Sequence, residues 1–233
     1  MGKKRHNILE TYNSEAPFAT EFRRLLYNIT KSKLLPDNSK AFLVTSASTG
    51  EGKSTISAFL GLTAATHRPR KTLLIDADLR RPVLHQLFDV EQDVGLSDII
   101  LEKAKIEECV KKTGVENLDL LTSGPRQENP TELFDSPHLA TFIESARFYY
   151  ELIIIDSAPV VPVSDPLIMG GEVDGIALVV KAGATQQEVV TRAANLIEQS
   201  GSRLLGVILN NVKQALPYYY NYKYYGYHYT SHK

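Results

Sequence analysis

Short apolar runs alternate with amphipathic segments along most of this chain. The runs contain almost no polar positions, which is typical of strands that are buried on both faces. Strands are predicted over residues 41–44, 71–76, 117–122, 152–156, 175–181 and 204–210. Helical patterns or turns lie between them, at 53–67, from Pro82, and at 95–103, 130–134, 137–148, 165–170 and 186–199. Strands that alternate with helices predict a doubly wound α/β fold, with a mostly parallel sheet and helices on both faces.

The chain ends differ in composition from this central part. Residues 1–16 are polar, and we expect them to be loose. Residues 17–32 place Phe18, Phe22, Leu25, Leu26 and Ile29 at helical spacing, which predicts an amphipathic helix before the first strand. Arg23 and Arg24 lie on or beside its polar face, which is either solvated or packs on a neighbouring subunit. One domain is therefore expected over residues 17–216.

Charge and cysteine content exclude several classes of protein. The 26 Lys and Arg residues balance 27 Asp and Glu residues, so overall charge gives no reason to expect nucleic-acid binding. A single cysteine excludes an intramolecular disulfide and a cysteine zinc site. No apolar run approaches the length of a membrane span, and the first residues lack the apolar core of a signal peptide. We expect a cytoplasmic protein that reaches a membrane only through a partner.

A phosphate-binding loop is predicted where the first strand meets a helix. The segment KAFLVTSASTGEGKSTIS matches the Walker A pattern GxxxxGK[ST], except that Ala47 replaces the first glycine. Backbone N–H groups of such a loop hold phosphate oxygens, a lysine reaches the outer phosphates, and a hydroxyl binds Mg²⁺. The predicted nucleotide-binding residues are Thr49, Gly50, Glu51, Gly52, Lys53, Ser54 and Thr55. The alternative is an ordinary glycine-rich turn.

Three carboxylates follow apolar runs and are expected to face this loop. LLIDAD supplies Asp76 and Asp78, and LIIID supplies Asp156 as the Walker B residue. An isolated aspartate at a strand end is more often a cap or turn residue, but three beside a Walker loop favour a Mg²⁺ site for phosphoryl transfer. Arg80 either contacts phosphate or forms a structural ion pair. Asn210, which ends the last strand, either hydrogen-bonds a base edge or simply terminates the strand.

The C-terminal segment 217–233 is rich in tyrosine. It holds eight of the twelve tyrosines and no leucine, isoleucine or valine, so we expect it to be disordered. Tethered to a phosphoryl-transfer site, it would supply acceptors at high effective concentration. The predicted phosphoacceptors are Tyr218, Tyr219, Tyr220, Tyr222, Tyr224, Tyr225, Tyr227 and Tyr229. The alternative is an aromatic tail without chemistry.

These motifs together carry a family resemblance. TSASTGEGKST, LLIDADLRRP, LTSGPRQENPTEL and LIIIDSAP, with the terminal tyrosine cluster, resemble the bacterial tyrosine kinases of capsular and exopolysaccharide systems. The form they resemble is the Gram-positive one, whose kinase is separate from its membrane adaptor. The resemblance implies ATP as phosphate donor and Mg²⁺ as cofactor. It places Lys53, Ser54, Asp76, Asp78 and Asp156 around them, with Asp78 drawing the proton from the incoming tyrosine.

The resemblance also implies partners. Such kinases are activated by the cytoplasmic end of a transmembrane chain-length regulator at the inner face of the membrane. They phosphorylate tail tyrosines between subunits of a homo-oligomeric ring, with a cognate phosphotyrosine phosphatase as a further partner. They regulate polysaccharide synthesis and export.

The helix that docks ring subunits in this family often carries ExxRxxR. In one register Glu21 and Arg24 match its first two positions and Tyr27 replaces the third. In the other register Thr20, Arg23 and Leu26 stand there. We therefore expect Glu21, Arg23 and Arg24 at an interface whose surface chemistry departs from the family's pattern.

Two other functions remain open on sequence grounds. A partitioning-type ATPase switch would share the Walker loop and Asp156, hydrolyse ATP and need no tyrosine tail. A nucleotide-binding scaffold would have its tail modified by another kinase.

Overall fold

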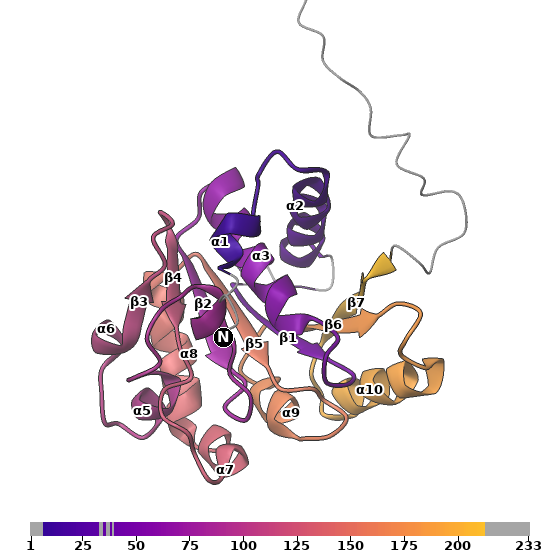
Figure 1. Cartoon of the computed structure of the whole chain (residues 1–233). Coiled ribbons are helices and arrows are strands. Elements are labelled where there is room, and N and C mark those ends of the chain that lie inside the picture. Colours follow the sequence, from indigo (N-terminus) through magenta and orange to yellow (C-terminus); the bar gives the residue numbers. More distant parts are fainter. Residues whose placement is uncertain (1–6, 33–34, 36–37, 39, 213–233) are drawn as a thin grey trace, which may run out of the picture.

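A seven-stranded sheet organises the computed structural model, which describes residues 7–32, 35, 38 and 40–212. The strand order is β3-β4-β2-β5-β1-β6-β7 (Figure 1). All neighbouring strands run parallel except β3 and β4, which pair antiparallel at one edge. The strands are β1 (Ala41–Ser46), β2 (Thr72–Ala77), β3 (Val110–Lys112), β4 (Leu118–Leu121), β5 (Leu152–Ser157), β6 (Gly175–Lys181) and β7 (Leu204–Asn210). The predicted fold class is confirmed.

Helices cover both faces of this sheet. They are α1 (Ile8–Thr11), α2 (Pro17–Thr30), α3 (Lys53–His67), α4 (Leu84–Leu87), α5 (Leu96–Ile100), α6 (Ile106–Cys109), α7 (Pro130–Phe134), α8 (Pro137–Tyr149), α9 (Asp165–Met169) and α10 (Gln187–Gln199). In β1, Ala41 and Leu43 join the core shared with α8, α9 and α10, while Phe42 and Val44 join the core shared with α1, α2 and α3. Because both faces are apolar, the strands read as unbroken hydrophobic runs.

The register of three strands brings the predicted carboxylates together. β5 lies between β1 and β2, and Asp156 pairs with Val44 on one side and with Asp76 on the other. The carboxyl ends of these strands therefore meet at one edge of the sheet, beside the start of α3. Ligands of open α/β sheets bind at this edge.

The N-terminal residues are more ordered than we expected. Of residues 1–16, those from 7 onward are described, and Ile8 in α1 is buried against the core. The Tyr12 hydroxyl lies 3.2 Å from those of Thr63 and Thr66 on α3. The prediction that residues 1–16 are loose is thus wrong for residues 7–16. Two apolar side chains of this segment pack against the core, and a four-residue helix is too short to be recognised from the sequence pattern. The short elements α6 and β3 were not predicted either.

The amphipathic helix predicted over 17–32 is confirmed as α2, which packs across α3 (Figure 1). Phe18 and Phe22 lie against Phe59 of α3, with ring centroids 5.4 and 5.1 Å apart. Both ring pairs are tilted, and aromatic pairs at these centroid distances stabilise the contact beyond the area that they bury. The helix that precedes the sheet is thus fixed to the helix that begins at the phosphate loop.

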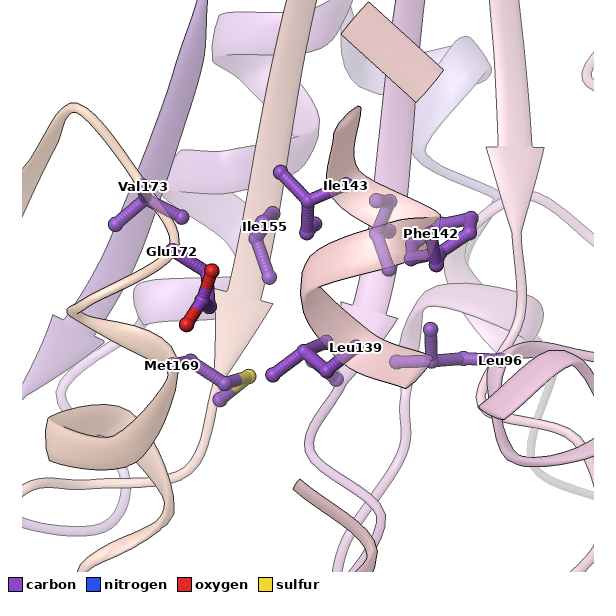
Figure 2. Close-up of a pocket in the computed structure, with 10 residues that line it drawn as sticks. Leu96, Leu139, Phe142, Ile143, Ile155, Met169, Glu172 and Val173 are labelled. Carbon is purple, nitrogen blue, oxygen red and sulfur yellow. The ribbon is translucent and has the colours of Figure 1, made fainter. Parts of the chain in front are cut away.

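A small apolar cavity lies on the other face, between α8, α9 and the sheet. Leu139 of α8 points toward Met169 of α9 and Ile143 lies beside Ile155 of β5, while Phe142 lies on the side of α8 nearer Leu96 (Figure 2). At about 10 Å³ it holds no more than one water molecule, and its walls are apolar apart from Glu172. This cavity is a minor packing defect in the core and is too small for a ligand.

Phe142→Ala is expected to destabilise the chain by about 3–5 kcal/mol, because the lost ring would enlarge this cavity. Phe148→Ala is the matched control on the same helix, since Phe148 is 84% exposed and Phe142 only 4%. The control should change the free energy of unfolding by no more than about 0.5 kcal/mol. Urea unfolding of both variants checks the pair, and equal losses would contradict the packing described here.

Candidate nucleotide and phosphoryl-transfer site

The loop between β1 and α3 has the geometry of a phosphate-binding loop. Gly50 and Gly52 adopt left-handed backbone conformations, with φ of 78° and 89°. Gly52 also has no room for a side chain, because a Cβ there would lie 2.3 Å from Nδ2 of Asn210. Ala47, which replaces the first glycine of the motif, is fully buried. The predicted arrangement of strand, glycine-rich loop and helix is confirmed.

Lys53, the first residue of α3, bridges two of the predicted carboxylates. Its Nζ lies 2.9 Å from Oδ2 of Asp78 and 3.7 Å from Oδ2 of Asp156. The Asp78 and Asp156 side chains are only 5% and 0% exposed, so water screens this cluster little. Burial alone would lower the pKa of Lys53, but the charges of Asp156 and Asp78 outweigh it and raise that pKa above its ordinary value. The ammonium therefore stays charged.

Asp156 keeps one oxygen without a hydrogen-bond partner. Its Oδ1 accepts a bond of 3.2 Å from the Ser57 hydroxyl, whereas its buried Oδ2 accepts none. Burial raises the pKa of this carboxyl to about 6, while the nearby Lys53 charge opposes the rise. An unpartnered buried carboxylate oxygen is costly unless a cation or donor completes it.

Asp76, predicted as a catalytic and metal-binding residue, accepts hydrogen bonds from the loop after β2. Its Oδ2 accepts from the backbone N–H groups of Val83 and Leu84, at 3.0 and 2.9 Å, and its Oδ1 from that of Asp78 at 3.3 Å. Burial, and next the charge of Asp156, raise its pKa to about 8. Both oxygens are engaged by backbone donors. Asp76 therefore also holds the loop that carries Asp78, and its role at the metal stays a prediction.

The oxygen atoms at this site are of the kind that bind Mg²⁺. This ion takes oxygen ligands, typically one or two carboxylates together with waters and substrate phosphates. Ser54 and Asp78 line the cleft, and Oδ2 of Asp156, which accepts no hydrogen bond, lies 3.7 Å from Nζ of Lys53. Among the described residues, no three His, Cys, Asp or Glu side chains form a metal cluster by themselves. A shortage of protein ligands is expected at a site where phosphate oxygens complete the coordination of the metal.

Glu51 and Asn210 stabilise the phosphate-binding loop through hydrogen bonds. The Glu51 carboxylate is buried, where it accepts from the backbone N–H of Ser48 at 2.9 Å and from the hydroxyl of Thr185, in the β6–α10 turn. The Asn210 amide donates to the Glu51 carbonyl at 2.8 Å. The amide predicted to read a base edge is therefore occupied by the loop itself. Thr185 was missed because nothing near it in the sequence marks its contact.

Arg80 forms a structural ion pair, which is one of the two roles that the sequence left open for it. Its Nε donates to Asp165 at 2.9 Å, and a terminal nitrogen donates to Thr131 at 2.9 Å. The Thr131 hydroxyl in turn donates to Asp165 at 2.6 Å. Arg80 still lines the cleft. The loops that follow β2 and β5 are thereby clamped to α7, through two residues that the sequence analysis did not single out.

An open cleft of about 460 Å³ joins these parts. One wall is the phosphate loop, with Lys53 and Ser54, and the other is formed by the segments after β2 and β5. The predicted loop residues that line it are Thr49, Gly50, Gly52, Lys53, Ser54 and Thr55. Its size suits a small ligand such as a nucleotide.

The predicted interface residues lie on α2, away from this cleft. Arg24 and Glu21 form an exposed ion pair of 2.9 Å on the helix surface. Arg23 instead donates to the carbonyl of Ser14, in the segment before the helix. The Glu21 and Arg24 side chains are more than half exposed on α2, and their role in assembly stays a prediction. The eight predicted phosphoacceptors, Tyr218 to Tyr229, lie outside the described residues.

Fold and site together define a nucleotide-binding protein of the P-loop class. A family model described as "CobQ/CobB/MinD/ParA nucleotide binding domain" matches residues 42–220. Tyrosine-protein kinase YwqD of Bacillus subtilis is 35% identical over 96% of this chain and 93% of its own. The chain belongs to this family of bacterial tyrosine-protein kinases.

Solved structures agree with that assignment. The kinase domain of Escherichia coli tyrosine kinase ETK superposes with a TM-score of 0.84 at 29% identity, over 95% of this chain and 88% of that one. The chimerical protein CapA2B2 gives a TM-score of 0.80 at 33% identity, over 85% and 87% of the two chains. Within the described part of this chain, no helix combines the length and apolar character needed to cross a membrane.

Replacing Glu51 by Ala is expected to weaken ATP binding about tenfold, because the loop loses two bonds to a buried carboxylate. Thr185→Val should act in the same direction, and Thr185→Ser should restore binding since it keeps the hydroxyl. Glu188→Ala, on the exposed first turn of α10, is the matched control. Calorimetric titration with Mg·ATP measures the effect, and wild-type affinity in Glu51→Ala would contradict the bracing role.

Without ligand and metal, the chain should lose stability as the pH rises from about 5 to 8. Asp76 and Asp156 have folded-state pKa values of about 8 and about 6, above the unfolded value of about 3.9. The folded state therefore holds more protons than the unfolded state in this window, and stability falls as they leave. Thermal unfolding of wild type and Asp76→Asn tests this. A wild-type slope that Asp76→Asn leaves unchanged would contradict the role of this carboxyl.

Proposed function

We propose that this protein is an ATP- and Mg²⁺-dependent protein-tyrosine kinase that phosphorylates the tyrosine cluster of its own C-terminal segment, between subunits. The observation that carries the proposal is the contact between Lys53 of the phosphate loop and Asp78 of the β2 loop. It places a group that can take a proton beside the group that reaches the outer phosphates. The named relatives and the tail composition point the same way.

The transfer follows from the roles of these side chains. When ATP is bound, Lys53 turns to its outer phosphates and releases Asp78 from the ion pair. The tyrosine hydroxyl gives its proton to Asp78, and its oxygen bonds to the γ-phosphorus while the bond to the bridging oxygen breaks. Phosphotyrosine and ADP result. Mg²⁺, which Ser54, Asp76, Asp78 and Asp156 would hold, would neutralise charge on the phosphates. Loop amides and α3 hold the remaining phosphate oxygens.

The family resemblance extends the proposal to partners. We propose activation by the cytoplasmic end of a transmembrane chain-length regulator, which brings the kinase to the inner face of the membrane. We further propose a homo-oligomer, in ring form where the outer face of α2 permits it, and a cognate phosphatase that removes the phosphates. The process served is capsular or exopolysaccharide synthesis and export.

An ATPase switch is the competing function, because the matched family model also covers MinD and ParA proteins. It would use the loop and Asp156 in the same way and would leave the tyrosines unmodified. Phosphotyrosine formation by the purified chain separates the two functions. A scaffold modified by another kinase would also fail to label itself.

Lys53→Met should lower phosphotyrosine formation at least a hundredfold, because the outer phosphates lose their buried cation. The exposed Lys103→Met is the matched control and should label like wild type. Mass spectrometry after incubation with Mg·ATP, with and without the adaptor's cytoplasmic peptide, gives the measurement. Unchanged labelling of a folded Lys53→Met chain would refute the assignment.

Replacing the eight tail tyrosines by Phe should remove most of the label. The structure narrows where any remaining label would fall: Tyr27 is 62% and Tyr149 48% exposed, whereas Tyr150 is only 7% exposed. The Tyr150 hydroxyl also donates to Asp119, at 3.0 Å. Site mapping by mass spectrometry decides the point, and full labelling at Tyr27 or Tyr149 would move the acceptors out of the tail.

A further inference from the structure

One wall of the cleft is apolar and takes no part in the phosphoryl transfer. It is formed by the side chains of Val83, Ala158, Pro159, Pro162 and Val163, which we call the apolar shelf. Ala158 and Pro159 are buried, Val83 and Val163 are half-buried, and Pro162 is exposed. Apolar surface left open beside a charged site indicates a ligand group that is itself apolar.

The strand order shows which end of the nucleotide the shelf faces. Val83 follows β2, and residues 158–163 follow β5, which are the two strands that supply Asp78 and Asp156. Lys53 reaches toward the same two carboxylates, so the outer phosphates lie on this side of the loop. Asn210 and Thr185 lie on the opposite side, after β7 and β6. The shelf is therefore beside the transferred phosphate.

The shelf is also held rigidly. The Thr45 hydroxyl donates to the Ala158 carbonyl at 2.7 Å, and the Val160 N–H donates to the Ser46 carbonyl at 2.8 Å. Asp165, directly beyond the shelf, is fixed by Arg80. Two prolines restrict the backbone between these anchors. A preformed surface loses little entropy when a ligand group packs on it.

We propose that the apolar shelf receives the aromatic ring of the acceptor tyrosine, supplied by residues 218–229 of a second copy of this chain, and selects tyrosine over serine. The inference rests on the proposed kinase function and names residues that position its substrate. A phenol ring on the shelf can present its hydroxyl to Asp78, which lines the same cleft. A serine hydroxyl on a short side chain would reach Asp78 only by bringing the polar backbone onto the shelf, where its N–H and C=O would lose water.

The phosphoryl transfer itself does not involve the shelf. The phenolic proton passes to the Asp78 carboxylate, the phenolic oxygen bonds to the γ-phosphorus, and the electron pair of the broken bond leaves with ADP. The shelf takes no part in bond making. Val83, Pro162 and Val163 are positioning residues, so their loss should act on the acceptor and not on ATP.

The experiment uses the full-length chain with Mg·ATP and a synthetic peptide of residues 217–233 as acceptor. The double variant Val83→Ser/Val163→Ser removes apolar surface from the shelf, and Val163→Ser alone serves if the double variant does not fold. Val207→Ser is the matched control, since Val207 lies 45% exposed on the edge strand β7, outside the cleft. A second peptide with every tyrosine replaced by Phe can occupy the shelf without accepting phosphate.

The KM for the peptide should rise about five- to tenfold in the double variant, while the KM for ATP changes less than twofold. The Phe peptide should compete with the tyrosine peptide on wild-type enzyme and should not compete with ATP. Val207→Ser should behave as wild type.

Four results would overturn the proposal. A rise confined to the KM for ATP would show that the shelf holds the base. Unchanged constants in a folded shelf variant, or no competition by the Phe peptide, would place the acceptor elsewhere and leave the kinase function intact. No tyrosine phosphorylation by the wild-type chain, on peptide or tail, would refute the kinase function and the shelf together.

Discussion

The ion pair between Lys53 and Asp78 is the interaction on which the site depends. Three carboxylates meet at the ends of two adjacent strands, and each is almost completely buried. Such a cluster is costly unless a cation or hydrogen-bond donors compensate it. Lys53 compensates Asp78 and, at 3.7 Å, part of Asp156; backbone N–H groups compensate Asp76, and Oδ2 of Asp156 accepts no hydrogen bond. The ligand-free site is therefore left incomplete in a way that a divalent cation and phosphates can complete.

Both walls of the cleft are fixed by groups that take no part in chemistry. On one side Glu51 ties the loop that carries Lys53 to Thr185, and Asn210 ties this loop to the last strand. On the other side Arg80 joins the β2 loop to Asp165 and Thr131. Catalysis by positioning and charge neutralisation requires this kind of rigidity, because the donors must be oriented before the reaction begins.

The cleft divides by polarity as well as by position. Its phosphate side offers backbone amides, a hydroxyl and a cation, and its opposite side offers valine, proline and alanine. A kinase for an aromatic hydroxyl has to accommodate one highly charged substrate and one apolar ring in contact with each other. The strand order provides this, since the loops after β2 and β5 supply both the carboxylates and the apolar surface.

The sequence by itself determined the fold class, the phosphate loop and the three carboxylates. Each is encoded locally: the strands as short apolar runs, the loop as two glycines before Lys53, and Asp76, Asp78 and Asp156 as the residues that end those runs. Only the tertiary structure shows which partners each carboxylate has. Asp76 and Asp78 stand two positions apart, and the sequence does not distinguish the one that accepts from backbone N–H groups from the one that pairs with Lys53. The tertiary structure also decided the roles of Glu51, Arg80 and Asn210. Their partners Thr185, Asp165 and the Glu51 carbonyl lie far away in the chain and meet them only when parallel strands bring their carboxyl ends to one edge of the sheet.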